Sequence, residues 1–423
     1  MSRRVAEVAA AEAADALISL PTGVLDSILA RVGLRDAVRT SALSRAWRRR
    51  WEALPSLDLD FPRAKGDKGA SAGLRAVDSV LLRCPGRVRR FYAYVDNLHA
   101  ERIDDWLLVF SRRSIEVFNL ISVVDGFIAL PSSLFSCTRL TTLRLYGCAI
   151  PPLPPVDFVG LPELRNLALI NVRFQENGEY QLEEIIVTSP SLKELLLWDV
   201  EIAGDFVEWT IQAPNLRHLN IRSAQDLGWN FGGLPSLYSA TIDIRDYLGD
   251  RDFSEFLTRF ASITKLEICT HHSPLKGAKI LQTLPCTFGN LKSLKLYTQF
   301  CELPSILSTF CLLRNAPNLE RLKIQIVNGA KQKNEANGEF QNAQWTDGMC
   351  ANLQFVQITG IHWLSNELSF IELILSKARL LRILSVSHGE KCSVSNEAAV
   401  NKLLNYTRAS SHADVIYEGK ASS

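Results

Sequence analysis

The chain has 423 residues, enough for two or three domains or for one elongated repeat protein. Its 47 basic and 45 acidic residues leave a formal charge of +2, which argues against a disordered chain and a bulk nucleic-acid binder. No apolar run reaches the roughly eighteen residues that a membrane span needs, so no spanning helix is predicted.

The opening residues are rich in alanine, and residues 1–16 are predicted to be a disordered tail. They lack a secretory apolar core, and Glu7, Glu12 and Asp15 argue against an organellar transit peptide.

Residues 17–61 predict a small three-helix unit. Pro21 suits a first helical turn, and five apolar residues then form one broad stripe at helical spacing: Val24, Leu25, Ile28, Leu29 and Val32. Gly33 separates a second short helix through Asp36, Ala37 and Val38. Ser41 or Ser44 is expected to cap a third, which carries Leu43, Trp47 and Trp51. So small a unit rarely folds unaided, and its apolar stripes predict docking onto another protein.

This stretch resembles the plant-type F-box. The resemblance rests on Leu20-Pro21, VLDSIL at 24–29, RDAVRTSALSRAW at 35–47 and LPSLDLDF at 54–61, although Gly23 and Gly33 replace the usual acidic residue and proline. It implies binding to a Skp-type adaptor and, through it, to a cullin. The expected adaptor-binding residues are Leu20, Pro21, Val24, Leu25, Ile28, Leu29, Ala37, Val38, Leu43 and Trp47.

Residues 31–50 carry seven arginines against one acid, Asp36. The run at 48–50 could serve as a nuclear signal or an RNA patch. Because the family's adaptor is acidic, we favour electrostatic steering toward that partner and expect no nucleic-acid partner.

Residues 62–87 predict a linker and a capping helix. PRAKGDKGASAG at 62–73 is typical of a mobile linker, and 74–84 has helical spacing that ends at Pro85-Gly86.

From residue 88 onward an apolar-x-x-apolar-x-apolar strand recurs. Its copies begin at 88, 115, 140, 164, 192, 216, 237, 263, 291, 319, 353 and 381. Most intervals lie within the roughly 20 to 29 residues of leucine-rich repeats. One such strand cannot bury its leucines alone, so the pattern predicts an α/β solenoid of about twelve irregular coils, with leucine-rich repeats over 88–327.

Function in such a solenoid is expected on the concave face, on the residues that alternate with the leucines. The candidate substrate-binding residues are Tyr146, Trp198, His218, Arg222, Tyr297, Lys323 and Gln325. Aromatic and arginine side chains are common interface anchors. The alternative is that Trp198 and Tyr146 only shield neighbouring leucines.

The C-terminal part predicts a polar insertion loop at 328–344, interpreted as a spacer, and then terminal repeats at 345–390. CLLRNAPNLERLKI at 311–324 and NLQFVQITGIHWLSNELSFIELILSKARLLRILSV at 352–386 resemble the FBD segment of plant F-box proteins. A helix is expected over 367–381, in a coil that caps the solenoid. Residues 391–423 are predicted to be a tail.

The nine cysteines include no CxxC pair, which predicts reduced, mostly buried thiols in the cytoplasm or nucleus. The only adjacent histidines are His271-His272, and we expect no metal and no cofactor. No catalytic motif occurs in a supporting context.

The resemblance therefore implies a non-catalytic substrate-recognition subunit of an SCF ubiquitin ligase. Two alternatives remain: a small-molecule-sensing F-box receptor, and a leucine-rich-repeat binding scaffold outside any ligase.

Overall fold

The computed structural model describes residues 21–29, 31–43, 47–63, 66, 69–154, 158–204, 209–246, 253–269, 283–327, 336, 338–389 and 395–418. Within these ranges no helix is long and apolar enough to cross a membrane, and no group of side chains is suited to a metal ion. The contacts divide the chain into two units, residues 1–192 with 200–206 and residues 193–199 with 207–423.

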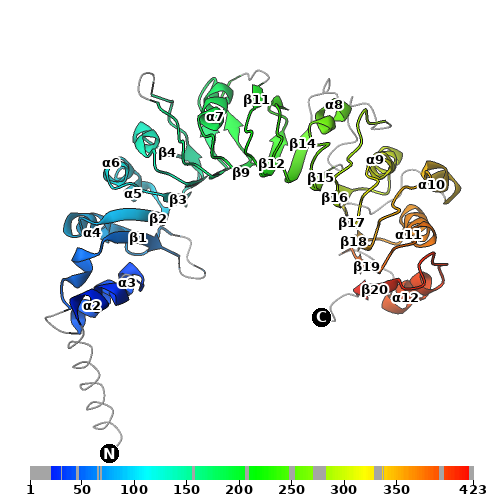
Figure 1. Cartoon of the computed structure of the whole chain (residues 1–423), viewed down its shortest axis with the longest axis horizontal. Coiled ribbons are helices and arrows are strands. Elements are labelled where there is room, and N and C mark those ends of the chain that lie inside the picture. The colour runs from blue at the N-terminus through cyan, green and yellow to red at the C-terminus, as the bar shows by residue number, and fades with distance from the viewer. Residues whose placement is uncertain are drawn as a thin grey trace, which may run out of the picture. The chain divides into compact units, whose positions relative to one another are not determined.

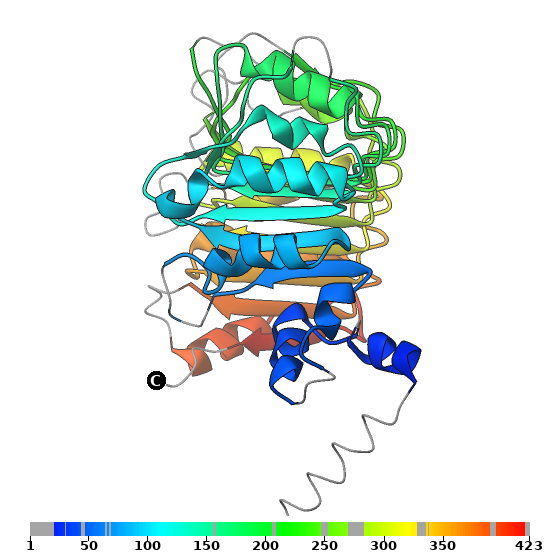
Figure 2. The ribbon, with the colours of Figure 1, turned by 90° about the vertical axis from the view of Figure 1, so that its left-hand side faces the viewer.

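The first unit is built on parallel strands that pair in chain order. They are β1 (Ser56–Phe61), β2 (Arg87–Val95), β3 (Val117–Ser122), β5 (Thr142–Tyr146) and β7 (Asn166–Ile170). The register aligns Leu120, Leu145 and Leu169 in one row, and all three are buried. Figure 2 shows these strands lying side by side.

Helices cover one side of the strands in this unit (Figure 1). They are α4 (Val77–Arg83), α5 (Asn97–Ala100), α6 (Ile103–Arg112) and α7 (Gly178–Val187), with the 3₁₀ turn η4 (Ser132–Ser136). The core between helix and strand is aromatic: the ring of Phe91 lies 5.1 Å from that of Phe110 and 5.6 Å from that of Phe118. Short outer strands β4 (Ile128–Ala129), β6 (Cys148–Ala149), β8 (Arg173–Phe174) and β10 (Glu201–Ile202) form a second sheet.

The second unit repeats the plan with nine parallel strands. They are β9 (Glu194–Trp198), β12 (His218–Gln225), β14 (Ser239–Asp246), β15 (Lys265–Cys269), β16 (Ser293–Thr298), β17 (Arg321–Ile326), β18 (Phe355–Ile361), β19 (Ile383–His388) and β20 (Asp414–Glu418). Its helices are α8 (Phe253–Thr258), α9 (Leu303–Arg314), α10 (Gly338–Gln344), α11 (Ser365–Lys377) and α12 (Asn396–Leu404). Strands β11 (Trp209–Ile211) and β13 (Trp229–Phe231) pair separately.

All twelve predicted strands are present, so the prediction of an α/β leucine-rich solenoid is confirmed. The repeat pattern works because its apolar positions face the helices and its intervening positions do not, as in β16, where Leu294 and Leu296 are fully buried and Lys295 is half-buried. The expected helices at 74–84 and 367–381 appear as α4, with the 3₁₀ turn η3 (Leu74–Ala76), and as α11.

Several predicted boundaries need correction. The predicted F-box range 17–61 already contains β1, which pairs with β2. The predicted tail 391–423 contains α12 and β20, and β20 pairs with β19 through Ile383 and Asp414. The predicted loop 328–344 contains α10. The strand-bearing solenoid therefore extends one strand beyond the predicted repeats at each end. At the N-terminal end that strand does carry the leucine pattern, as LPSLDL at 54–59, but these residues were assigned to the F-box.

The linker prediction for 62–73 is also wrong for its last residues. The backbone N–H of Ser71 donates to the Tyr94 carbonyl at 2.8 Å, and the Tyr94 N–H donates to the Ser71 hydroxyl at 2.8 Å. These bonds fix this residue to β2. Gly86, after α4, is required by a close approach, since a Cβ atom there would lie 2.1 Å from the Leu54 carbonyl oxygen.

The N-terminal helices are α2 (Thr22–Leu29) and α3 (Leu34–Arg39), followed by the 3₁₀ turns η1 (Thr40–Ala42) and η2 (Arg50–Ala53). The third α-helix predicted through Trp47 and Trp51 is not formed in described residues 47–53, because Arg49 leaves helical geometry with φ −129° and ψ 11°. The Ser41 hydroxyl makes no capping bond, and Ser44 lies outside the described residues.

Candidate functional site: the N-terminal helices and the concave strands

Helix α2 presents two different faces. Leu25 and Leu29 are 2% and 1% exposed, and the helix packs against η2, where Trp51 is also buried. Val24 and Ile28, on the neighbouring face about 100° around the helix, are 44% and 38% exposed. The one apolar stripe of the sequence is therefore divided into a core face and an outer face.

The ten predicted adaptor residues follow this division. Leu25, Leu29, Ala37 and Trp47 are interior, and Pro21, Val24, Ile28, Val38 and Leu43 are exposed. Leu20 lies outside the described residues. A buried residue supports the shape of a docking surface, whereas an exposed apolar residue gains by being covered. We name Pro21, Val24 and Ile28 of this surface the outer face of α2.

Positive charge accompanies these helices. Asp36 pairs with Arg39 and Asp26 with Arg50, each at 3.2 Å. Arg31, Arg35, Arg48 and Arg49 are exposed, and Arg45 lies outside the described residues. The described part of the cluster thus keeps a cationic surface, as steering toward an acidic partner requires.

A second candidate surface lies on the outward side chains of the second unit. On β9 and β12 the Trp198 indole N–H donates to the Asn220 Oδ1 atom at 2.8 Å. The Arg222 guanidinium lies 6.0 Å from the centre of the Trp198 ring and 3.6 Å from Asp243 on β14. These groups border a hollow of about 190 Å³ that extends to Glu267 and Tyr297.

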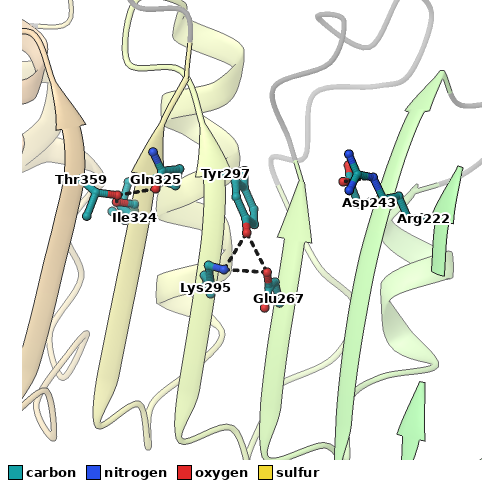
Figure 3. Close-up of polar contacts among 8 residues, drawn as sticks. All are labelled: Arg222, Asp243, Glu267, Lys295, Tyr297, Ile324, Gln325 and Thr359. Atoms are coloured by element: carbon teal, nitrogen blue, oxygen red, sulfur yellow. Dashed lines mark hydrogen bonds and ion pairs between the residues drawn. The ribbon is translucent and has the colours of Figure 1, made fainter. Parts of the chain in front are cut away.

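Glu267, Lys295 and Tyr297 form a closed polar triad (Figure 3). Glu267 Oε1 accepts from Lys295 Nζ at 2.8 Å and from the Tyr297 hydroxyl at 2.9 Å, and Lys295 Nζ also donates to that hydroxyl at 2.6 Å. Burial works to lower the pKa of Lys295, but its bonds to Glu267 and Tyr297 outweigh burial and raise the pKa above the ordinary value. Burial chiefly raises the pKa of Tyr297, so the ammonium and the neutral phenol form a fixed donor group.

The remaining predicted concave residues lie in separate surroundings. His218 Nδ1 lies 2.8 Å from the Ser239 hydroxyl. Gln325 Oε1 accepts from the Thr359 hydroxyl at 2.5 Å. Lys323 is exposed and lies in register with Lys295. Tyr146, which is 42% exposed, belongs to the first unit.

Sequence reasoning therefore named four residues and missed the groups that hold them. The four are Trp198, Arg222, Tyr297 and Gln325. The missed partners are Asn220, Asp243, Glu267, Lys295 and Thr359. Asn220, Glu267 and Lys295 occupy the position between the last two apolar residues of their repeats, so applying the repeat rule evenly to every coil would have found them.

Two family models match parts of this chain, one of an F-box domain and one of leucine-rich repeats. The F-box domain model matches residues 17–58, and the model described as "FBD-associated F-box protein At5g56370, LRR repeats" matches residues 103–231. The predicted F-box and leucine-rich-repeat architecture is thereby confirmed.

Its similarity to individual proteins covers nearly all of the chain. The F-box/FBD/LRR-repeat protein At1g13570 of Arabidopsis thaliana is 27% identical over 96% of this chain and 99% of its own length. The F-box/FBD/LRR-repeat protein At3g52680 of the same plant is 27% identical over 73% of this chain and 71% of its own length. The FBD-associated F-box protein At5g38590, also of Arabidopsis thaliana, is 27% identical over 74% of this chain and 78% of its own length.

Proposed function

We propose that this protein is the substrate-recognition subunit of an SCF-type ubiquitin ligase. F-box domains generally bind Skp1-type adaptors, and the outer face of α2 supplies exposed apolar side chains for such a contact. The adaptor would connect the chain to a cullin, and the concave strands of the second unit would hold a protein target.

The contribution of the chain is proximity, without catalysis of its own. A target held on the same protein as the adaptor meets the ubiquitin-charged enzyme at a raised effective concentration. The observation that carries the proposal is the exposure of Val24 and Ile28 on a helix whose other face is already packed.

The test is binding of the purified chain to a purified Skp-type adaptor. Val24→Glu with Ile28→Glu is expected to weaken binding at least tenfold, because two charges enter an apolar contact while the core is untouched. The control is Leu404→Glu in α12, which changes another exposed apolar residue and should leave adaptor binding unchanged. Unaltered adaptor binding by the double variant, or no binding by the natural chain, would overturn the proposal.

One observation favours small-molecule sensing as a second candidate function. A cavity of about 860 Å³ lies between α3 and β1 in the first unit, within the size range of ligand sites. Val38, Leu57 and Phe61 provide apolar walls, and Arg35 and Arg90 provide positive charge. Capture of a partner that depends on an added anionic small molecule would favour this function, and capture that is indifferent to one would favour the first.

A further inference from the structure

Strands β15, β16 and β17 carry an excess of positive charge on their outward positions. The basic residues of these strands are Lys265, Lys295, Arg321 and Lys323, and Glu267 is their only acidic residue. The register pairs Lys265 with Ser293 and Ser293 with Arg321, and it pairs Lys295 with Lys323. We name the four basic residues the basic patch.

Among the described residues, a carboxylate pairs with one charge of the basic patch, that of Lys295. Glu267 bonds Lys295 at 2.8 Å. The neighbouring Lys292 and Glu320 neutralise each other at 2.9 Å. Lys265 on β15 and Arg321 and Lys323 on β17 therefore leave three positive charges on the two strands that flank β16.

Aromatic rings, and not carboxylates, hold two of these three cations. Lys265 Nζ lies 5.2 Å from the centre of the Tyr238 ring, and the Arg321 guanidinium lies 5.2 Å from that of Phe355. A cation–π contact restrains the side chain without cancelling its charge. Lys265 and Arg321 are thus ordered in advance and still able to bind an anion, and Lys323 beside them is exposed.

A polar hollow adjoins the basic patch at the start of the same strands. It has a volume of about 460 Å³, and Thr264 and Glu320, which directly precede Lys265 and Arg321, lie in its wall. The other lining residues are Gly289, Asn290, Lys292, Asn318, Asn352 and Gln354. Its asparagine amides already donate to backbone carbonyls of the preceding coil, Asn290 to Ser262 and Asn318 to Gly289, so their oxygens are what they can offer to a peptide N–H.

We propose that the basic patch and this hollow bind an extended, Asp/Glu-rich segment of the target protein. This inference rests on the proposed function, since it names the kind of target that the concave face holds. Neighbouring strands lie about 5 Å apart, so Lys265 and Arg321 are separated by about 10 Å across β16. An extended peptide covers that distance in about three residues, which places two of its carboxylates over the two cations. Arg321 can bind a carboxylate with two parallel hydrogen bonds.

The test uses the full chain and fluorescence anisotropy with labelled peptides of one length. The probes are an acidic Asp/Glu peptide, its Asn/Gln counterpart, a phosphoserine peptide without Asp or Glu, and a single-stranded RNA. We expect the acidic peptide to bind tightest, with an affinity that falls as salt rises. Lys323→Glu should weaken this binding about tenfold, which corresponds to about 1.4 kcal/mol.

The matched control is Lys402→Glu on α12, an exposed lysine whose reversal gives the same change in net charge. It should leave peptide binding unchanged, and both variants should melt at the same temperature as the natural chain. Equal loss in the two variants, equal binding of the Asn/Gln peptide, or tighter binding of the phosphopeptide or RNA would overturn the inference. This assay contains no adaptor, so its result is independent of the adaptor-binding test described above. If the chain binds the acidic peptide here but fails to bind the adaptor there, the inference stands and only the ligase proposal is defeated.

Discussion

Val24 and Leu25 are adjacent in sequence and serve opposite purposes. Leu25 is buried in the first unit, whereas Val24 points outward, although the spacing of apolar residues treats both as one stripe. Periodicity finds the apolar arc of a helix but not which part of a wide arc packs internally. The sequence could therefore identify the helix and its docking role, but the exposed half of the site required the packing against η2.

Glu367 carries a prediction about pH. Its Oε2 atom accepts from the backbone N–H groups of His362 and Leu364 at 2.9 and 3.0 Å, and burial, the larger effect, raises its pKa to about 7 from 4.5. The folded chain therefore keeps this proton to a higher pH than the unfolded chain does. The resulting stability is complete below pH 4.5 and is lost as the pH rises through about 7.

Glu367→Gln should remove this dependence, because the amide does not ionise and still offers an oxygen acceptor. This pH dependence is measured as the difference between the free energies of unfolding in urea at pH 5 and at pH 8. The natural chain is expected to lose about 3 kcal/mol more than the variant between these values. His362 Nδ1 lies 3.9 Å from Glu367, so His362→Gln serves as the control for titration of the imidazole. A variant with the same pH dependence as the natural chain would contradict the assignment.

Among the elements, every strand with the leucine pattern was predictable, β1 included, and β20 was not. β1 and β20 each have a partner strand on one side within their units. The residues of β20 alternate between exposed and half-buried. Its sequence, DVIYE, therefore lacks the regularly spaced leucines by which the other strands were predicted. The sequence pattern reports burial, and none of the residues of β20 is buried, whereas Leu57 and Leu59 of β1 are.

Helix α12 and β20 are expected to act as the cap of the second unit. Ala399 and Leu403 of α12 are buried, and β20 covers the edge of β19. A chain shortened to residue 389 should melt several degrees lower and aggregate, since it exposes an apolar coil and an unpaired strand edge. Thermal unfolding and light scattering measure this, with a chain shortened only to Glu418 as the control. Identical behaviour of both shortened chains would contradict a capping role.

At the scale of the whole molecule, the repeats make stability local. Each coil packs on its neighbours in sequence, so a destabilising substitution should lower the local stability most in its own coil and less in coils further along the chain. Because the chain divides into two units, we expect the effect of a defect to be confined mainly to the unit that contains it. The sequence does not mark this boundary, because the leucine spacing continues across it.

Leu296→Ala in β16 tests this expectation. The side chain is fully buried, and its truncation should cost about 2–5 kcal/mol. Hydrogen exchange followed by mass spectrometry should show the largest loss of protection in β15, β16 and β17, and little change in β2 and β3. An equal loss in both units would show that they unfold as one.

The pairing of β1 with β2 also determines how force passes through the first unit. The chain leaves the F-box helices at η2 and enters β1 after two intervening residues, so the helices are joined to the solenoid by a strand of its own sheet. Residues 62–86, which look like a tether in the sequence, form a side excursion between two paired strands. Lengthening or shortening this excursion would leave the reach between F-box and repeats unaltered.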